Sequence, residues 1–219
     1  MASPASTIII TEGKADDEFI EQLIKVSGID PEAFEVRRAL ESESYGYSGF
    51  ERRLAALKTE TGLDNRRAII LVADNDDLND KFFLKIRDQI SSAGGYGVPS
   101  APLELVSGDE RIPPIAVLML PWADEPGCLD SLCLQAACNQ RPHYVACIEQ
   151  FVTCVKALDW PISSLHKLKL RCLLSSACKQ DPNTPLVHVW KSNRRDENLV
   201  PLNDPCFGRI VEFLRSFLS

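Results

Sequence analysis

No apolar run in the sequence is long enough to cross a membrane. The longest runs, such as residues 112–120, are far shorter than the ~20 residues that a spanning helix needs. Residues 1–7 contain no basic segment leading into a long apolar stretch, as a signal peptide would. We therefore expect a cytoplasmic protein that does not associate with a membrane.

Paired cysteines of the kind that bind zinc are also missing. None of the eight cysteines lies in a Cys-x-x-Cys pair or beside suitably spaced histidines, which zinc sites usually need. Most lie among Leu, Val and Ala at helical spacing, where a reduced cysteine packs as a small hydrophobic residue. We expect core positions, with disulfides or a metal site as the alternatives, for Cys128, Cys133, Cys138, Cys147, Cys154, Cys172, Cys178 and Cys206.

The sequence has no excess of basic residues. Its net charge is −7, whereas a broad nonspecific nucleic-acid binder normally carries a basic face. An acidic metal site would itself add negative charge, so an enzyme that acts on phosphates stays compatible with this balance. The chain also lacks the Gly-x-x-x-x-Gly-Lys-[Ser/Thr] phosphate loop of many ATPases.

Strand and helix patterns alternate along the first 120 of the 219 residues. Strands are predicted at residues 7–10, 34–39, 68–73 and 115–120, of which the first, third and fourth are short apolar runs. Apolar residues at helical spacing follow the first three predicted strands, with an expected loop at 42–49. This alternation predicts an α/β fold with a mainly parallel sheet flanked by helices.

The second half of the chain is expected to be mostly helical. Helical patterns cover residues 129–137, 144–158, 164–178 and 206–217, with a short strand expected at 186–190. We interpret residues 1–140 as the α/β core and residues 141–219 as a helical extension packed on it. Together they are expected to form one domain with a sizeable core.

Acidic residues follow three of the predicted strands. Glu12 and Asp16 follow the first strand, Asp74 and Asp76 the third, and Asp130 lies beyond the fourth. In open α/β sheets, ligands bind beyond the carboxyl ends of the strands. Alternate residues of an extended segment project to the same side, so Asp74 and Asp76 could reach one cation. Because converging carboxylates repel one another, the pattern favours a site for Mg²⁺ or a similar hard cation.

The same acidic residues have a structural alternative. Asp-rich turns between strands and helices are common, since Asp caps helices and forms turns. Asp16, Asp17 and Glu18 are typical of the first turn of a helix, where they suit the helix dipole. The joint placement at successive strand ends is what favours the metal site.

Two segments resemble the TOPRIM signature. They are Ile-Ile-Ile-Thr-Glu-Gly-Lys at residues 8–14, with Asp16 after it, and Leu-Val-Ala-Asp-Asn-Asp at residues 71–76. In that family a Glu-Gly after the first strand and an Asp-x-Asp after a later strand hold catalytic metal. Topoisomerases, primases and the overcoming-lysogenization-defect (OLD) nucleases share this unit. The resemblance implies a TOPRIM-like sheet.

The resemblance is closest to a branch of small TOPRIM-like proteins related to the OLD-type nucleases. That branch has a Pro, then a Gly-x-Leu-acidic motif, then a Lys-containing helix. Pro121, the Gly-Cys-Leu-Asp of residues 127–130 and the Lys-Leu-Lys of residues 167–169 stand in this order. The acidic position is more often Glu in the branch, and here it is Asp130.

Each matched residue acquires an expected role from this resemblance. Glu12 would be a metal ligand or general base, and Asp74 and Asp76 would be metal ligands. Asp16 and Asp130 would hold a second metal. Lys167 or Lys169 could neutralise a phosphate, although a solvated helix face is the alternative for both. Lys14 is a further candidate phosphate contact.

The function implied is that of a metal-dependent phosphodiester hydrolase, an OLD-like nuclease acting on DNA or RNA with Mg²⁺ or Mn²⁺. Water would attack the phosphorus in line, with Glu12 assisting proton removal. The chain lacks the extra domains that primases and topoisomerases use. Because OLD-like domains often work with an ABC-type ATPase, such an ATPase would have to be a separate partner.

Two other classes of function stay open. The chain could be a non-catalytic TOPRIM-like binding or regulatory subunit of an ATPase-containing complex. It could also be a phosphatase or nucleotide-binding enzyme on a similar sheet. The sequence leaves open DNA or RNA, one metal or two, and whether the chain forms a homo-oligomer.

Overall fold

A computed structural model describes residues 6–40, 49–76, 79–122, 124–190 and 198–218. Its strands are β1 (Thr7–Thr11), β2 (Phe34–Arg38), β3 (Ile69–Asp74) and β4 (Ile115–Leu120). Its α-helices are α1 (Lys14–Val26), α2 (Phe50–Leu57), α3 (Asn79–Ala93), α4 (Leu129–Gln140), α5 (Pro142–Cys154), α6 (Ile162–Ala177) and α7 (Gly208–Arg215). None of the helices in the described ranges is both long and apolar enough to span a membrane.

The four strands form one parallel sheet in the order β2-β1-β3-β4. Helices cover both faces of the sheet, and the chain after β4 is largely helical. The predicted α/β class, with a parallel sheet and a helical C-terminal extension, is therefore confirmed, and the arrangement is consistent with a TOPRIM-like fold. All four strands lie within one or two residues of their predicted positions.

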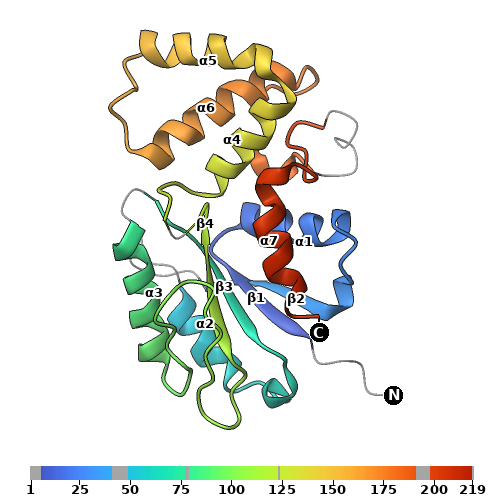
Figure 1. The fold of residues 1–219 in the computed structure, drawn as a ribbon, viewed down its shortest axis with the longest axis vertical. Coiled ribbons are helices and arrows are strands. Elements are labelled where there is room, and N and C mark those ends of the chain that lie inside the picture. Colours follow the sequence, from blue (N-terminus) through green and yellow to red (C-terminus); the bar gives the residue numbers. More distant parts are fainter. Residues whose placement is uncertain (1–5, 41–48, 77–78, 123, 191–197, 219) are drawn as a thin grey trace.

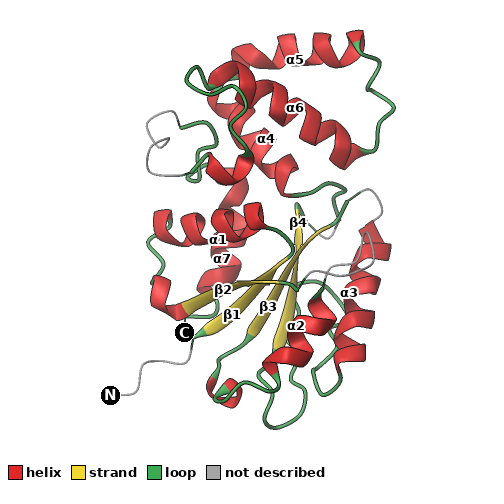
Figure 2. Cartoon of the chain, turned by 180° about the vertical axis from the view of Figure 1, so that it is seen from behind, coloured by secondary structure: helices red, strands yellow, loops and turns green. Residues whose placement is uncertain are grey.

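Alternation along the strands divides the core into two layers. Ile9, Ile70 and Leu118 point to the face that α1 and α7 cover. Their neighbours Ile8 and Leu71 point to the opposite face, where α2 and α3 pack. Figure 1 and Figure 2 show these two layers, one on each side of the sheet. β1, β3 and β4 are buried along almost their whole length and are mostly apolar, which is why they could be predicted from the sequence. The edge strand β2 is only half-buried and contains three charged residues.

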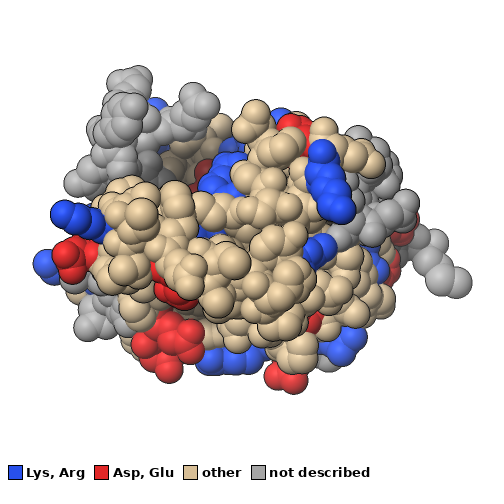
Figure 3. Space-filling model, turned by 90° about the horizontal axis from the view of Figure 1, so that it is seen from above, with Lys and Arg blue, Asp and Glu red and all other residues tan. Residues whose placement is uncertain are grey.

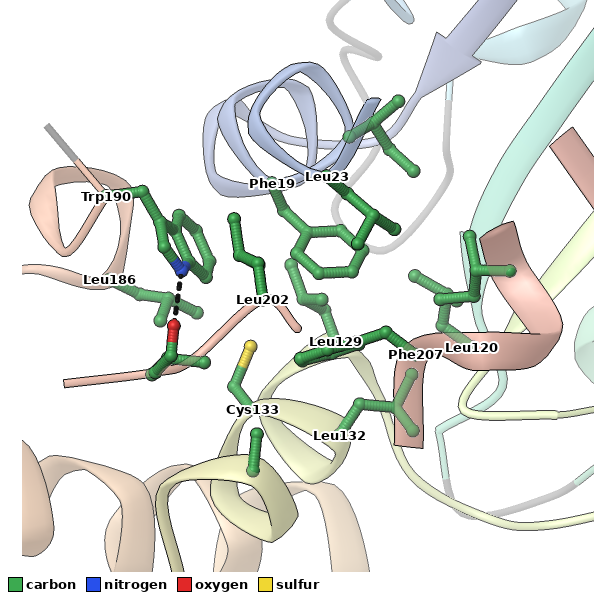
Figure 4. Close-up of a cluster of buried hydrophobic side chains, with 14 of the residues drawn as sticks. Phe19, Leu23, Leu120, Leu129, Leu132, Cys133, Leu186, Trp190, Leu202 and Phe207 are labelled. Atoms are coloured by element: carbon green, nitrogen blue, oxygen red, sulfur yellow. Dashed lines mark hydrogen bonds between the residues drawn. The ribbon is translucent and has the colours of Figure 1, made fainter. Parts of the chain in front are cut away.

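The C-terminal part packs on the first of these layers. The Phe19 ring of α1 lies 5.7 Å from the Trp190 ring and 5.2 Å from the Phe207 ring, measured between centroids. Leu129, Leu132 and other apolar residues complete the cluster (Figure 4). The helices α4, α5 and α6 lie above the carboxyl ends of the strands (Figure 1).

The strand expected at residues 186–190 is wrong. Residues Leu186–His188 form a 3₁₀ helix. Leu186, Val189 and Trp190 are all buried. Val189 follows Leu186 by three residues, so a helical turn places these side chains on the same side, against the core. The Trp190 Nε1–H donates to the carbonyl of Val200 at 3.1 Å (Figure 4). A short apolar run of this length is compatible with a strand or with a helical turn, and packing against the surrounding core favours the helical turn here.

Two further predicted elements, the helix at 144–158 and the loop at 42–49, have different outcomes. The helix expected at 144–158 ends at Cys154, since Lys156 adopts a positive φ of 56° that stops the helix. Of the loop expected at 42–49, residues 42–48 lie outside the described residues.

The cysteines follow the core expectation in part. All eight are free thiols. Cys128, Cys133 and Cys178 are buried, whereas Cys138, Cys172 and Cys206 are half-buried. The core expectation is wrong for Cys147 and Cys154 of α5, which are exposed.

Candidate functional site

Asp74 ends β3 at the carboxyl edge of the sheet. Its Oδ1 accepts a hydrogen bond of 2.8 Å from the backbone N–H of Leu129, the first residue of α4. Burial, followed by the charges of Asp16 and Glu12, raises the pKa of Asp74 well above its usual value. The Leu129 N–H and the charge of Lys167 oppose this shift without cancelling it. The carboxylate thus ties two elements together at an electrostatic cost.

Asp16 lies in the first turn of α1, on the side that faces α4. Its Oδ2 accepts from the backbone N–H of Gly13 at 2.8 Å, which closes the helix start. Burial is the main cause that raises the pKa of Asp16 to about 6, and the charges of Asp17 and Asp130 add to it. Asp16 therefore has both the helix-start role and a place among the clustered carboxylates.

The neighbouring acidic residues have different partners. Asp17 accepts from the Thr11 hydroxyl and from the Arg38 guanidinium. Glu18 accepts from the Gln22 amide at 3.0 Å. The helix-start interpretation holds for Asp17, which lies in the first turn of α1, whereas Glu18 lies just after that turn.

Glu12 and Asp76 lie at the rim of the site. Glu12 follows β1 directly, is exposed, and its charge contributes to the raised pKa of Asp74. Asp76 has a positive φ of 46°, and its carbonyl accepts from the Gly127 N–H at 2.5 Å. The premise of an extended Asp-x-Asp segment is therefore wrong at Asp76, because the chain turns there to pair with Gly127. Asp77 lies outside the described residues.

Asn75 holds the loop that leads to α4. Its side chain is buried, and its Nδ2 donates to the carbonyls of Trp122 and Glu125, both at 2.8 Å. These bonds hold Trp122 and Glu125 beside the end of β3, on the segment that leads to Asp130 of α4. The sequence did not reveal the role of Asn75, because its partners Trp122 and Glu125 lie far away in the chain.

Helix α6 brings positive charge to the carboxylates. Burial raises the pKa of Asp130, while the charges of Lys167 and Arg171 partly lower it again. Partial burial opposes the charge on Lys167, but Cys128, Asp74, Asp130 and Asp76 together outweigh this and raise its pKa. Lys167 therefore lies within electrostatic reach of the carboxylates, and its role towards a phosphate stays a prediction. Arg171 was missed, although it lies one helical turn after Lys167.

The two other candidate lysines do not join this group. Lys169 pairs with Glu149 of α5, with 2.7 Å between Nζ and Oε1. Lys14 is the first residue of α1 and is exposed. The solvated-face alternative does not describe Lys169, because its side chain is only 16% exposed in this ion pair.

The donor set is composed of oxygen atoms. Burial and the charges of Asp74 and Asp130 raise the pKa of the Cys128 thiol to about 12, so it stays protonated and is a poor metal ligand. Carboxylates without a thiolate fit Mg²⁺ or Mn²⁺ better than a soft metal. In the described parts of the chain, however, no group of three or more His, Cys, Asp or Glu side chains stands ready to hold a metal ion.

The family model described as "Protein of unknown function (DUF3226)" matches residues 6–219. No curated protein and no solved structure matches the chain.

Proposed function

The chain belongs to the family described as Protein of unknown function (DUF3226), and we propose that it is a metal-dependent phosphodiester hydrolase acting on DNA or RNA. One observation carries the proposal. Three separate segments of the sequence supply Glu12 with Asp16, Asp74, and Asp130. The Leu129 N–H, next to Asp130, donates to Asp74, and the charges of the carboxylates act on one another or on Lys167 at the carboxyl edge of the sheet. Carboxylates that lie close together repel one another and destabilise the fold. A bound cation that neutralises their charge removes this cost.

Asp74 and Asp16 are the central ligands in this proposal. Each uses one carboxylate oxygen for a backbone N–H, which fixes its orientation and leaves the second oxygen for a cation. Asp130 and Asp76 would complete the set after side-chain rotation. Mg²⁺ or Mn²⁺ held there would stabilise the negative charge that develops on a phosphoryl group.

The remaining residues bind and move protons in this proposal. Lys167 and Arg171 attract the phosphate, since both lie on the same side of α6 and face the carboxylates. Glu12 is exposed at the rim, where its carboxylate can accept a proton from the attacking water.

The test is cleavage of a panel of DNA and RNA substrates with Mg²⁺ or Mn²⁺. Asp74→Asn removes the central charge but keeps an oxygen for the Leu129 N–H. We expect it to lower activity about 100-fold or more, since several kcal/mol of transition-state stabilisation are lost. Lys167→Met should also lose activity. Lys169→Met should not, because Lys169 pairs with Glu149 and does not face the carboxylates.

A second candidate is a non-catalytic binding or regulatory subunit, with a separate ATPase as its partner. The absence of a ready three-ligand group in the described residues favours it. Calorimetry separates the two candidates. Metal binding without cleavage would contradict the hydrolase proposal, and the lack of both would leave the non-catalytic subunit as the better account.

A further inference from the structure

A groove runs between α5 and α6 on the side of the carboxylate site. The two helices pack antiparallel, as the Lys169–Glu149 pair and the bond from the Tyr144 hydroxyl to the Ser176 carbonyl show. The groove has a volume of about 420 Å³, within the usual range of ligand pockets. Its lining consists of Tyr144, Cys147, Ile148, Phe151, Arg171, Cys172, Ser175 and Ser176.

The chemistry of this lining differs from that of the protein as a whole. The chain carries a net charge of −7, yet among the described lining residues the one charge is that of Arg171, and there is no carboxylate. Phe151 is 43% exposed although it is a large aromatic residue. The face seen from above α5 is mostly uncharged (Figure 3). A polyanion would therefore not be repelled here.

Arg171 joins the groove to the carboxylate site. It lines the groove, and its charge also acts on Asp130. Its Nη1 contacts the Thr184 carbonyl at 3.5 Å, the long limit of a hydrogen bond. Lys167, one turn earlier on α6, faces the carboxylates. A chain with regularly spaced phosphates could thus contact Lys167 at the site and Arg171 at the mouth of the groove.

We propose that the groove between α5 and α6 holds the nucleotide next to the reacting phosphate of a single-stranded nucleic acid. The inference rests on the proposed function and names its substrate class. The base would stack on the exposed Phe151 ring, and its phosphate would bind Arg171. Stacking on aromatic rings together with cation contacts is how proteins hold single strands without reading sequence. In a duplex the base is stacked and paired, so it could not enter.

Two thiols of α5 provide an internal test. Cys147 lines the groove and Cys154 does not, although both are exposed. The full-length protein would be alkylated in the presence of a chelator, with either a short mixed-sequence single strand or the matching duplex added. Mass spectrometry would follow the alkylation rates of Cys147 and Cys154. The single strand should slow alkylation of Cys147 at least severalfold and leave Cys154 unchanged. Equal rates with and without the single strand, or equal slowing of both thiols, would overturn the proposal.

A matched pair of variants provides the second test. Phe151→Ala removes the stacking ring, whereas Val155→Ala changes a similarly exposed residue outside the groove. Fluorescence anisotropy should show about tenfold weaker binding of the labelled single strand to Phe151→Ala and no change for Val155→Ala. Unchanged binding by Phe151→Ala, or no single-strand binding by the original protein, would overturn the proposal.

Hydrolysis of bis(p-nitrophenyl) phosphate reports separately on the catalytic site. We expect Val155→Ala, which lies outside the groove, to keep the metal-dependent rate of the original protein. Absence of this hydrolysis in all three proteins, together with the expected binding pattern, would contradict the hydrolase and leave the groove in place.

Discussion

At the scale of single residues, Asp74 shows how the fold maintains an unfavourable charge. Burial and the neighbouring carboxylates Asp16 and Glu12 raise its pKa, and the Leu129 N–H supplies the compensating hydrogen bond. That hydrogen bond needs an oxygen acceptor and does not need the charge. Asparagine at this position separates the two contributions.

The metal-free Asp74→Asn protein is therefore expected to be more stable than the original. Relief of the repulsion should contribute about 1 kcal/mol, which corresponds to a rise in Tm of roughly 2–4 °C. Added Mg²⁺ or Mn²⁺ should then stabilise the variant far less than the original. Thermal unfolding with and without metal measures both effects. Asp124→Asn, at an exposed loop position, is the control, and a lower Tm for Asp74→Asn would contradict the argument.

Asp16 predicts a pH dependence of stability. Its pKa is raised from 3.8 to about 6 in the folded protein, so the folded state binds more protons than the unfolded state between these values. Stability of the metal-free protein should therefore fall as the pH rises from about 4 to about 6. The contribution is of the order of 2 kcal/mol.

Asp16→Asn provides the comparison for this dependence. Asparagine can still accept from the Gly13 N–H, so the helix start is kept while the titrating group is removed. The difference in unfolding free energy between the two proteins, measured by urea denaturation at several pH values, should grow from pH 4 to pH 6. A constant difference would show that Asp16 titrates normally.

The sequence alone identified part of the site. Asp16, Asp74 and Asp130 could be predicted because each follows a strand whose apolar pattern is unambiguous. Lys167 came only from the resemblance, since nothing in the residues of α6 indicates that this helix folds back over the sheet. Arg171 and Asn75 were missed for the same reason: their roles depend on contacts between distant segments.

At the scale of elements, the turn before α4 positions Asp130. Gly127 has a φ of +136°, and a Cβ at this position would lie 2.4 Å from the Ser131 Oγ and 3.2 Å from the Pro121 Cδ. The Ser131 hydroxyl accepts from the Cys128 N–H at 3.0 Å and so caps the helix. A side chain at Gly127 would thus disturb both the loop and the helix start.

Gly127→Ala is expected to destabilise the protein by about 1–3 kcal/mol and to weaken metal binding. Gly28→Ala is the matched control. Gly28 also has a positive φ, +66°, but a Cβ there would meet no atom within 4 Å, so this variant should cost about 1 kcal/mol or less and leave metal binding unchanged. Denaturant unfolding and calorimetry measure the two effects. Equal losses of unfolding free energy in both variants would mean that the contact with Ser131 does not contribute to stability.

Elements were predictable where burial and pattern agreed. β1, β3 and β4 are buried on both faces, so their apolar runs have no competing interpretation, whereas the edge strand β2 is half-buried and carries charged residues. The run at 186–190 is just as apolar, but it packs as a 3₁₀ turn against Phe19 and Phe207. Which of the two forms arises depends on a tertiary neighbour that is far away in the sequence.

At the scale of the whole molecule, the core and the helical extension share one apolar layer. Phe19 of α1 contacts the rings of both Trp190 and Phe207. Both aromatic residues lie more than 170 residues after Phe19 in the sequence. Leu129 and Leu132 belong to the same cluster. A fragment of residues 1–140 would expose this face of α1, so the two parts are expected to unfold together.

The full chain is therefore expected to unfold in a single transition, and the fragment 1–140 in none that is cooperative. Trp122 lies in the first part and Trp160 and Trp190 in the second, so circular dichroism and the fluorescence of single-tryptophan variants follow the parts separately. Phe19→Ala should lower the free energy of unfolding by about 3–5 kcal/mol, so that both midpoints fall together. Leu84→Ala, at a position 48% exposed, should lower neither. Separate midpoints for the two parts, or a Phe19→Ala effect confined to the first, would mean that the extension folds as an independent domain and that the shared layer does not couple it to the sheet.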